Sequence, residues 1–130
     1  MAVQAPGFGK VIDAPFAETL ERTRAALREQ GFGVITEIDV QATMRQKLGR
    51  KMRPYTILGA CHPESAYRVL TAEPEMGLLL PCNVIVYETD DGTRVSAIDA
   101  REMLAMSAAD GLDGVAAGVD AGLRQALELL

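Results

Sequence analysis

The feature that most restricts the fold of this chain is a regular alternation of strand-like runs with segments of helical spacing. Glycine or proline separates most of these segments from the next. The expected order is strand, helix, strand, helix, strand, helix, strand, strand, helix and helix. This order predicts an α/β fold of the α+β type, a two-layer sandwich. Its helices should pack mainly on one face of a mixed, largely antiparallel sheet.

The first half of the chain divides at clear boundaries. We expect a loose tail over 1–7, a strand over 8–12, a helix over about 15–30 ended by glycine, and a strand over 32–39. In the segment 32–39, side chains alternate in the pattern of a strand with one well-buried face. Asp39 is a suitable N-cap for a second helix, which Gly49 would end. Val40, Met44 and Leu48 share one face of that helix.

The second half repeats this pattern with shorter helices. We expect strands over 55–60, 78–88 and 93–98, a helix between Pro63 and Pro74, a short helix after Asp99 that includes Met106, and a final helix over 110–130. Pro81 interrupts the strand over 78–88, and proline cannot donate to a strand ladder. That strand is therefore expected to lie at an edge or to be bulged at Pro81.

The final helix contains a row of glycines at positions 111, 114, 118 and 122. Each interior glycine costs about 1 kcal/mol of helix stability relative to alanine. One interpretation is a close backbone approach to the sheet or to a second subunit, and the other is drift in a marginal helix. The charged residues among them argue against a membrane dimerisation motif.

Length and composition restrict the class of protein. A chain of 130 residues with 48% hydrophobic and 24% charged residues is expected to be one domain over 1–130. The net charge of -5 argues against a general nucleic-acid binder. The apolar runs predict no signal peptide and no membrane span, so two reduced cysteines in the cytoplasm are expected.

A basic cluster follows the second predicted helix. Its members are Arg45, Lys47, Arg50, Lys51 and Arg53. One interpretation is a contact with an anion or a nucleic acid. The other is a solvated loop after a helix C-terminus, where the helix dipole favours cations.

Any chemistry is expected in residues 55–88, which contain both cysteines and the only histidine. Cys61 ends a predicted strand, and His62 and Pro63 enter a helix. A thiol at the positive end of a helix dipole can have a lowered pKa. Cys82 follows Pro81, where the irregular strand can redirect its side chain. The two sulfurs can meet if their strands are antiparallel neighbours, and cannot if a parallel crossover separates them.

Three interpretations of these residues remain open. The first is thiol redox chemistry, with Cys61 and Cys82 as the catalytic pair. The second is a metal site at Cys61, His62 and Cys82, although a closed zinc site needs a fourth ligand. The third is structural, since unpaired cysteines are commonly buried. No nucleophile elbow, phosphate loop or dinucleotide motif is present.

The chain resembles a bacterial family known as domain of unknown function 302. The similar segments are GFGVITEIDVQATMRQKLG at 31–49, RPYTILGACHPESAYRVL at 53–70, GLLLPCNVIVYE at 77–88 and VSAIDAREML at 95–104. The family pattern often has proline where this chain has Ala100. The resemblance implies a compact two-layer α/β fold and a homodimer, without an established activity. It adds weight to a function for Cys61 and Cys82.

These observations predict a cytoplasmic, dimeric domain with a small-ligand, metal or thiol-redox site. The expected ligand-binding residues are Cys61, His62, Pro81, Cys82 and Asn83. The cofactor is unknown, and neither a membrane nor a nucleic acid is the expected partner. The alternatives are a structural or interaction protein with core cysteines, and an anion- or nucleic-acid-binding module using the basic cluster.

Overall fold

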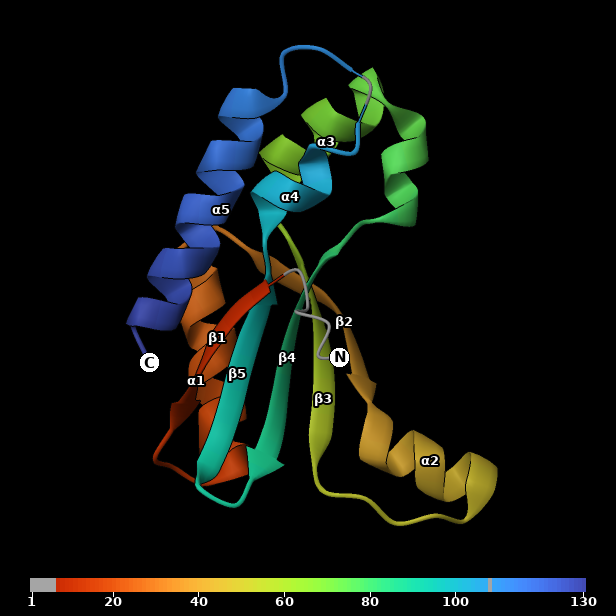
Figure 1. Cartoon of the computed structure of the whole chain (residues 1–130), viewed down its shortest axis with the longest axis vertical. Helices are drawn as coiled ribbons and strands as arrows, with labels where there is room; N and C mark the ends of the chain where they lie inside the picture. The colour runs from red at the N-terminus through yellow and green to blue at the C-terminus, as the bar shows by residue number, and fades with distance from the viewer. Residues whose placement is uncertain (1–6, 108) are drawn as a thin grey trace, which may run out of the picture.

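The sheet has five strands in the order β1-β5-β4-β3-β2, and every neighbouring pair is antiparallel (Figure 1). The computed structural model describes residues 7–107 and 109–130, so most of the tail expected over 1–7 lies outside the described residues. The strands are β1 (Gly7–Ile12), β2 (Gly33–Asp39), β3 (Tyr55–Cys61), β4 (Cys82–Thr89) and β5 (Gly92–Ile98).

The helices lie in three places around this sheet (Figure 1). They are α1 (Phe16–Glu29), α2 (Val40–Leu48), α3 (Pro63–Ala72), the 3-10 helix η1 (Pro74–Leu78), α4 (Ala100–Leu104) and α5 (Asp113–Glu128). The helices α1 and α5 pack together and cover one face of the sheet. At one end of the sheet lie α3, α4 and η1, and α2 projects at the opposite end. The predicted two-layer α/β fold and its element order are confirmed.

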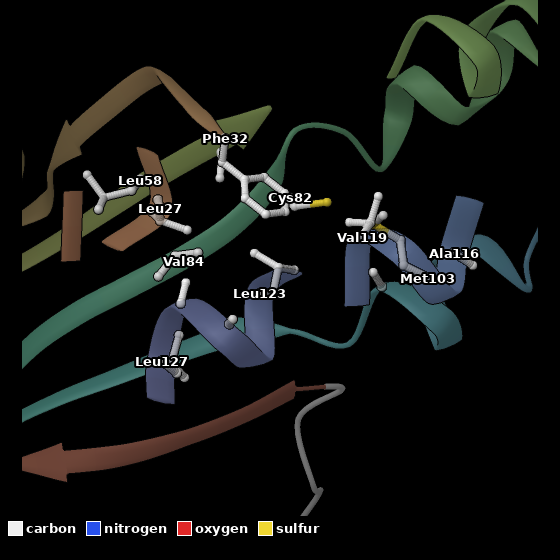
Figure 2. Close-up of a cluster of buried hydrophobic side chains, with 14 of the residues drawn as sticks. Leu27, Phe32, Leu58, Cys82, Val84, Met103, Ala116, Val119, Leu123 and Leu127 are labelled. Carbon is white, nitrogen blue, oxygen red and sulfur yellow. The ribbon is translucent and has the colours of Figure 1, made fainter. Parts of the chain in front are cut away.

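The core lies between the sheet and the pair α1 and α5 (Figure 2). Alternate residues of the central strands, such as Leu58 and Val84, are fully buried and meet Leu27 of α1 and Leu123 of α5. Each such side chain contributes about 1.5–3 kcal/mol by leaving water. Aliphatic side chains therefore supply most of the stability of this tryptophan-free chain.

The predicted helix boundaries follow local backbone chemistry. Asp39 accepts a hydrogen bond from the Ala42 backbone N–H at 2.9 Å and so caps α2. Asp99 accepts one from the Glu102 N–H at 3.1 Å and caps α4 in the same way. Gly49 ends α2 in the left-handed conformation, with φ of 64°. These three predictions are confirmed, whereas Met106 lies beyond the end of α4.

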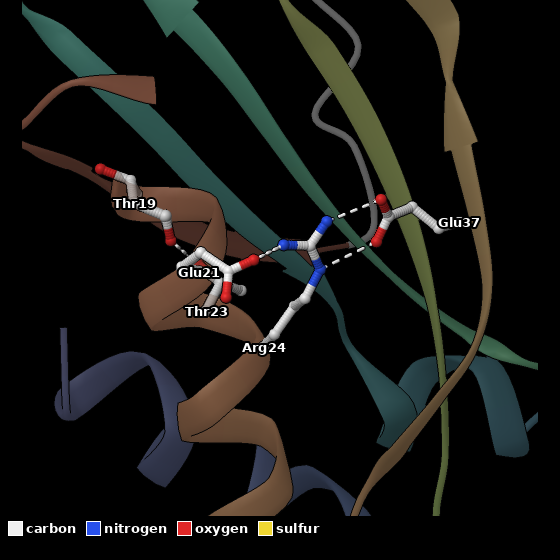
Figure 3. A network of polar contacts seen from close by, with 5 residues as sticks. All are labelled: Thr19, Glu21, Thr23, Arg24 and Glu37. Carbon is white, nitrogen blue, oxygen red and sulfur yellow. Dashed lines mark hydrogen bonds and ion pairs between the residues drawn. The ribbon is translucent and has the colours of Figure 1, made fainter. Parts of the chain in front are cut away.

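The prediction that β2 has one well-buried face is wrong. Most of this strand is exposed, because β2 is an edge strand and neither of its faces is fully covered. The register shifts at Ile35, whose side chain is 61% exposed. Arg24 of α1 donates two hydrogen bonds to the carboxylate of Glu37, at 2.9 and 2.6 Å (Figure 3). A polar contact therefore joins β2 to α1 where a buried apolar face was expected.

The prediction of a strand over 78–88 is also wrong in its first residues. Residues 74–78 form η1, and β4 begins only at Cys82. It then pairs with both β3 and β5, so it is a central strand and not an edge strand. Pro81 is compatible with this position because it lies just before the first ladder residue, where no strand hydrogen bond is lost.

No residue of α2 is buried, although Val40, Met44 and Leu48 were expected to share an apolar face. Leu48 is 59% exposed, and Met44 is exposed as well. The helix is held by its caps and by a hydrogen bond from the Gln41 side chain to the Met52 carbonyl at 2.9 Å. Most of its apolar face, including Met44 and Leu48, is therefore exposed in this chain.

The glycines of α5 divide into two kinds. A Cβ on Gly122 would lie 2.8 Å from Cε2 of the buried Phe32, so this glycine permits a close helix contact. A Cβ on Gly118 or Gly114 would meet no atom within 4 Å. Close approach therefore explains Gly122, and no packing reason explains the other two.

Within residues 7–107 and 109–130, no helix has both the length and the apolar character needed to cross a bilayer.

Candidate ligand pocket

A pocket of about 280 Å³ lies at the end of the sheet where α3, α4 and η1 are found. Its wall combines the end of β3, the first turns of α3, the segment before β4, and parts of α4 and α5. Cys61, His62, Pro81 and Cys82 all line it. Four of the five expected ligand-binding residues are thus brought to one cavity. Asn83 is exposed and does not line it.

The strand register brings the two cysteines near each other. Cys82 is the partner of Ala60 in the antiparallel pair of β3 and β4, so Cys61 is one residue further along. The topological question that the sequence left open is therefore resolved in favour of neighbouring strands. Both cysteines are free thiols, Cys82 buried and Cys61 partly exposed.

The two thiols differ in their environment. Cys82 is only 5% exposed, and its sulfur points towards the side of Met103 and Val119 (Figure 2). Burial, and secondarily the neighbouring Cys61, raises the pKa of the Cys82 thiol from the ordinary 9.0 to about 11. At neutral pH Cys82 is therefore a protonated thiol and a weak nucleophile.

His62 is the N-cap residue of α3, but its side chain makes no capping hydrogen bond to that helix. Its Nδ1 lies 2.9 Å from the Ser65 hydroxyl oxygen, within hydrogen-bond distance. The ring also meets Phe32 edge to face, with 5.5 Å between centroids. These contacts hold the imidazole at the pocket wall, where it and Ser65 supply polar atoms.

Pro81 is held close to the sheet by a glycine on the neighbouring strand. A Cβ on Gly59 would collide with Cγ of Pro81 and with the Thr36 hydroxyl. The missing side chain at Gly59 thus lets the segment that carries Pro81 and Cys82 lie against β3. This contact helps to shape the pocket wall.

The chemical character of the pocket changes with depth. Its most buried lining residues are apolar or weakly polar, and they include Val69, Cys82, Met103 and Val119. The partly exposed ones include Cys61, His62 and Ser65, and the exposed ones are Ile35, Leu70 and Gly77. No Asp, Glu, Lys or Arg is among the lining residues.

A metal centre finds little support in this geometry. Among the residues that the structure describes, no three His, Cys, Asp or Glu side chains are grouped to hold a metal ion. The expected donor set of Cys61, His62 and Cys82 shares a cavity without forming such a group.

Comparison with known proteins agrees with this fold. Residues 8–130 match the family described as "Domain of unknown function DUF302". The chain belongs to this family. A crystal structure of an uncharacterized conserved DUF302 protein from Bacillus stearothermophilus is 27% identical, with a TM-score of 0.86. That similarity covers 97% of this chain and 98% of the other. No curated protein matches the sequence.

In this DUF302 member the basic cluster lies away from the pocket. It occupies the end of α2 and the loop before β3, where Arg45, Arg50 and Lys51 line a separate surface cleft. Arg53 forms an ion pair with Asp90 of the turn between β4 and β5. This pair lowers the pKa of Asp90 and raises the pKa of Arg53. One member of the cluster is therefore already engaged within the chain.

Several pocket residues were not predicted from the sequence. Met103 and Val119 come from α4 and α5, far along the chain, and nothing local marks them as pocket residues. Ser65 had a weak local signal, because it is three residues after the N-cap His62, where side chains readily contact the cap.

Proposed function

We propose that this protein is a small-ligand-binding domain of the reducing cytoplasm, with its ligand in the pocket lined by Cys61, His62 and Cys82. The observation that supports this proposal is the pocket itself. It is concave and mostly apolar, and a few polar atoms lie at one side of it, as in small-molecule sites generally. The four expected residues at its wall support the same location.

Binding accounts for the thiols better than redox exchange does. A resolving cysteine acts as a thiolate, and the pKa of Cys82, at about 11, leaves little thiolate at neutral pH. A buried protonated thiol behaves instead as a small apolar side chain in a pocket wall. The side chains of Cys61, His62 and Cys82 are not grouped as metal ligands, which likewise favours an organic ligand over a metal ion.

The proposal is tested by thermal shift with a library of small organic molecules on three proteins. They are the wild type, Ala66→Leu, which fills the pocket, and Ala72→Leu, which places the same change on an exposed part of α3. We expect some compounds to raise the melting temperature of the wild type and of Ala72→Leu, but not of Ala66→Leu. If no compound separates Ala66→Leu from the other two, the binding function is wrong.

We also infer that the protein is a homodimer, joined through α2 and the sheet face opposite α1 and α5. Exposed apolar side chains are found there, including Ile38 and Val11 on the sheet and Met44 and Leu48 on α2. Charge supports a second copy as the partner. Residues 40–53 carry five basic and no acidic side chains, and the rest of the chain has 18 acidic against eight basic ones. Residues 40–53, the basic arm, of each copy would thus meet the acidic remainder of the other copy.

Sedimentation equilibrium tests this interface. The double variant Met44→Glu and Leu48→Glu should be a monomer, whereas Gly118→Leu on the outer side of α5 should remain a dimer. Dissociation by Gly118→Leu alone would move the interface to α5, and a monomeric wild type would refute the dimer. Salt-sensitive binding of RNA or DNA would instead assign the arm to nucleic acid.

A further inference from the structure

The order of side chains along the pocket shows which end of a ligand would enter first. The deep end is formed by the buried apolar side chains of Val69, Met103 and Val119. The protonated thiol of Cys82 lies among them. The hydrogen-bonding groups, His62 and Ser65, are nearer the surface. A ligand whose polar end entered first would lose the hydrogen bonds of that end to water without replacing them, which an apolar site strongly disfavours.

The lining also selects against charge. None of its residues is an Asp, Glu, Lys or Arg, so no permanently charged side chain in the pocket wall offers a counter-ion to an anionic or a cationic group. An isolated charge that leaves water without a partner is strongly disfavoured. By contrast, the Ser65 hydroxyl and the His62 imidazole can each donate or accept a hydrogen bond, which suits a neutral hydroxyl or amide.

The size of the cavity limits the ligand further. The cavity volume of about 280 Å³ is near the lower end of the range for small-molecule sites, so the ligand should be small. Ile35 and Leu70 line the mouth and are exposed, so they lie beyond the hydrogen-bonding groups.

We propose that the ligand of this pocket is an uncharged amphiphile, an aliphatic or aromatic group with one hydrogen-bonding head. Its apolar end lies between α3, α4 and α5, and its head lies beside Ser65 and His62. This inference rests on the proposed binding function and narrows it to one chemical class.

Isothermal titration calorimetry with three homologous series of probes tests the class. The series are the primary n-alkanols from butanol to decanol, the n-alkanoates and the n-alkylammonium ions of equal length. For the alkanols, affinity should rise about fourfold with each methylene and level off within the series, once the chain is longer than the cavity. The alkanoates and alkylammonium ions should bind at least about tenfold more weakly because their charge is unpaired.

Variants locate the two ends of the probe. Ser65→Ala should weaken alkanol binding about two- to tenfold by removing one hydrogen bond. Ala66→Leu should abolish binding, and Ala72→Leu should not change it. Gly77→Val narrows the pocket independently, and a Cβ there makes only ordinary contact with Leu70 Cδ2, at 3.8 Å.

The outcomes separate the two proposals. Alkanoates or alkylammonium ions that bind as tightly as alkanols, or an affinity that does not change with chain length, would overturn the uncharged class and leave the binding function standing. If no series binds the wild type more tightly than Ala66→Leu and Gly77→Val, this class is overturned. The binding function is then decided by the library experiment alone.

Discussion

Raising the pH from 8 to 11 should destabilise this protein through one buried thiol, Cys82. Its pKa is about 11 in the folded protein and takes the ordinary value of 9.0 when the chain unfolds. Between these two values the unfolded chain releases a proton that the folded chain retains, so alkaline conditions favour unfolding. The stabilisation is complete below pH 9 and is lost as the pH rises to about 11. A difference of two pKa units, at ~1.36 kcal/mol each, corresponds to about 3 kcal/mol.

Urea denaturation followed by far-UV circular dichroism at pH 8, 9, 10 and 11 measures this loss. Tyr55, whose pKa is also raised by burial and then by Tyr87, contributes a loss of the same sign. The quantity to compare is therefore the difference in pH dependence between the wild type and Cys82→Ala. That difference should be about 2 kcal/mol between pH 8 and pH 11, whatever the stability of the variant at pH 8, because the rest of the loss falls above pH 11.

Cys61→Ala is the matched control, because it removes the partly exposed thiol and leaves the burial of Cys82 in place. It should retain most of the alkaline loss. An identical pH dependence in the wild type and Cys82→Ala would refute the reasoning. So would alkylation of Cys82 in the native protein at pH 8 as fast as that of Cys61, because a buried, protonated thiol should be inert until the chain unfolds.

Two further predictions concern stability and are measured by urea denaturation at pH 7. Gly122→Ala should destabilise the protein by about 1–3 kcal/mol through its clash with Phe32, whereas Gly118→Ala should stabilise it by up to about 1 kcal/mol. Equal effects of the two would contradict the packing described for α5. Arg24→Ala should cost no more than about 1 kcal/mol, because its bonds to Glu37 are partly exposed to solvent, and the cost should shrink in 1 M salt. A larger, salt-independent loss would contradict a surface ion pair.

Much of the fold was predictable because it depends on local chemistry. A helix cap such as Asp39 needs only a carboxylate three residues before a free N–H, and a stop such as Gly49 needs only a residue that tolerates positive φ. The errors arose where tertiary position outweighs local pattern. The residues of β2 alternate like those of a half-buried strand, but β2 lies at an edge, where a bulge at Ile35 interrupts its pairing. The apolar run before Cys82 was taken for strand, and it forms η1 and a connecting segment instead.

The candidate site was predictable in part. Cys61, His62, Pro81 and Cys82 were selected by residue type and by their places at element ends, and they line one pocket. Asn83 was predicted with them and lies outside, because alternate residues of a strand point to opposite faces. The activated thiolate expected from a helix N-terminus was proposed for Cys61. That hypothesis stays a prediction, and burial raises the pKa of the neighbouring Cys82 thiol instead of lowering it.

The sequence by itself determined the order of the elements, their caps and turns, the family, and the four chemically distinctive residues at the pocket wall. These depend on neighbours within a few positions of the chain. Only the tertiary structure decided that β3 and β4 are antiparallel neighbours, which brings both cysteines to one end of the sheet. It also decided that Met103 and Val119 close the pocket from distant helices. The physical reason is that pairing and burial depend on the arrangement of the whole sheet, which no local pattern in the chain specifies.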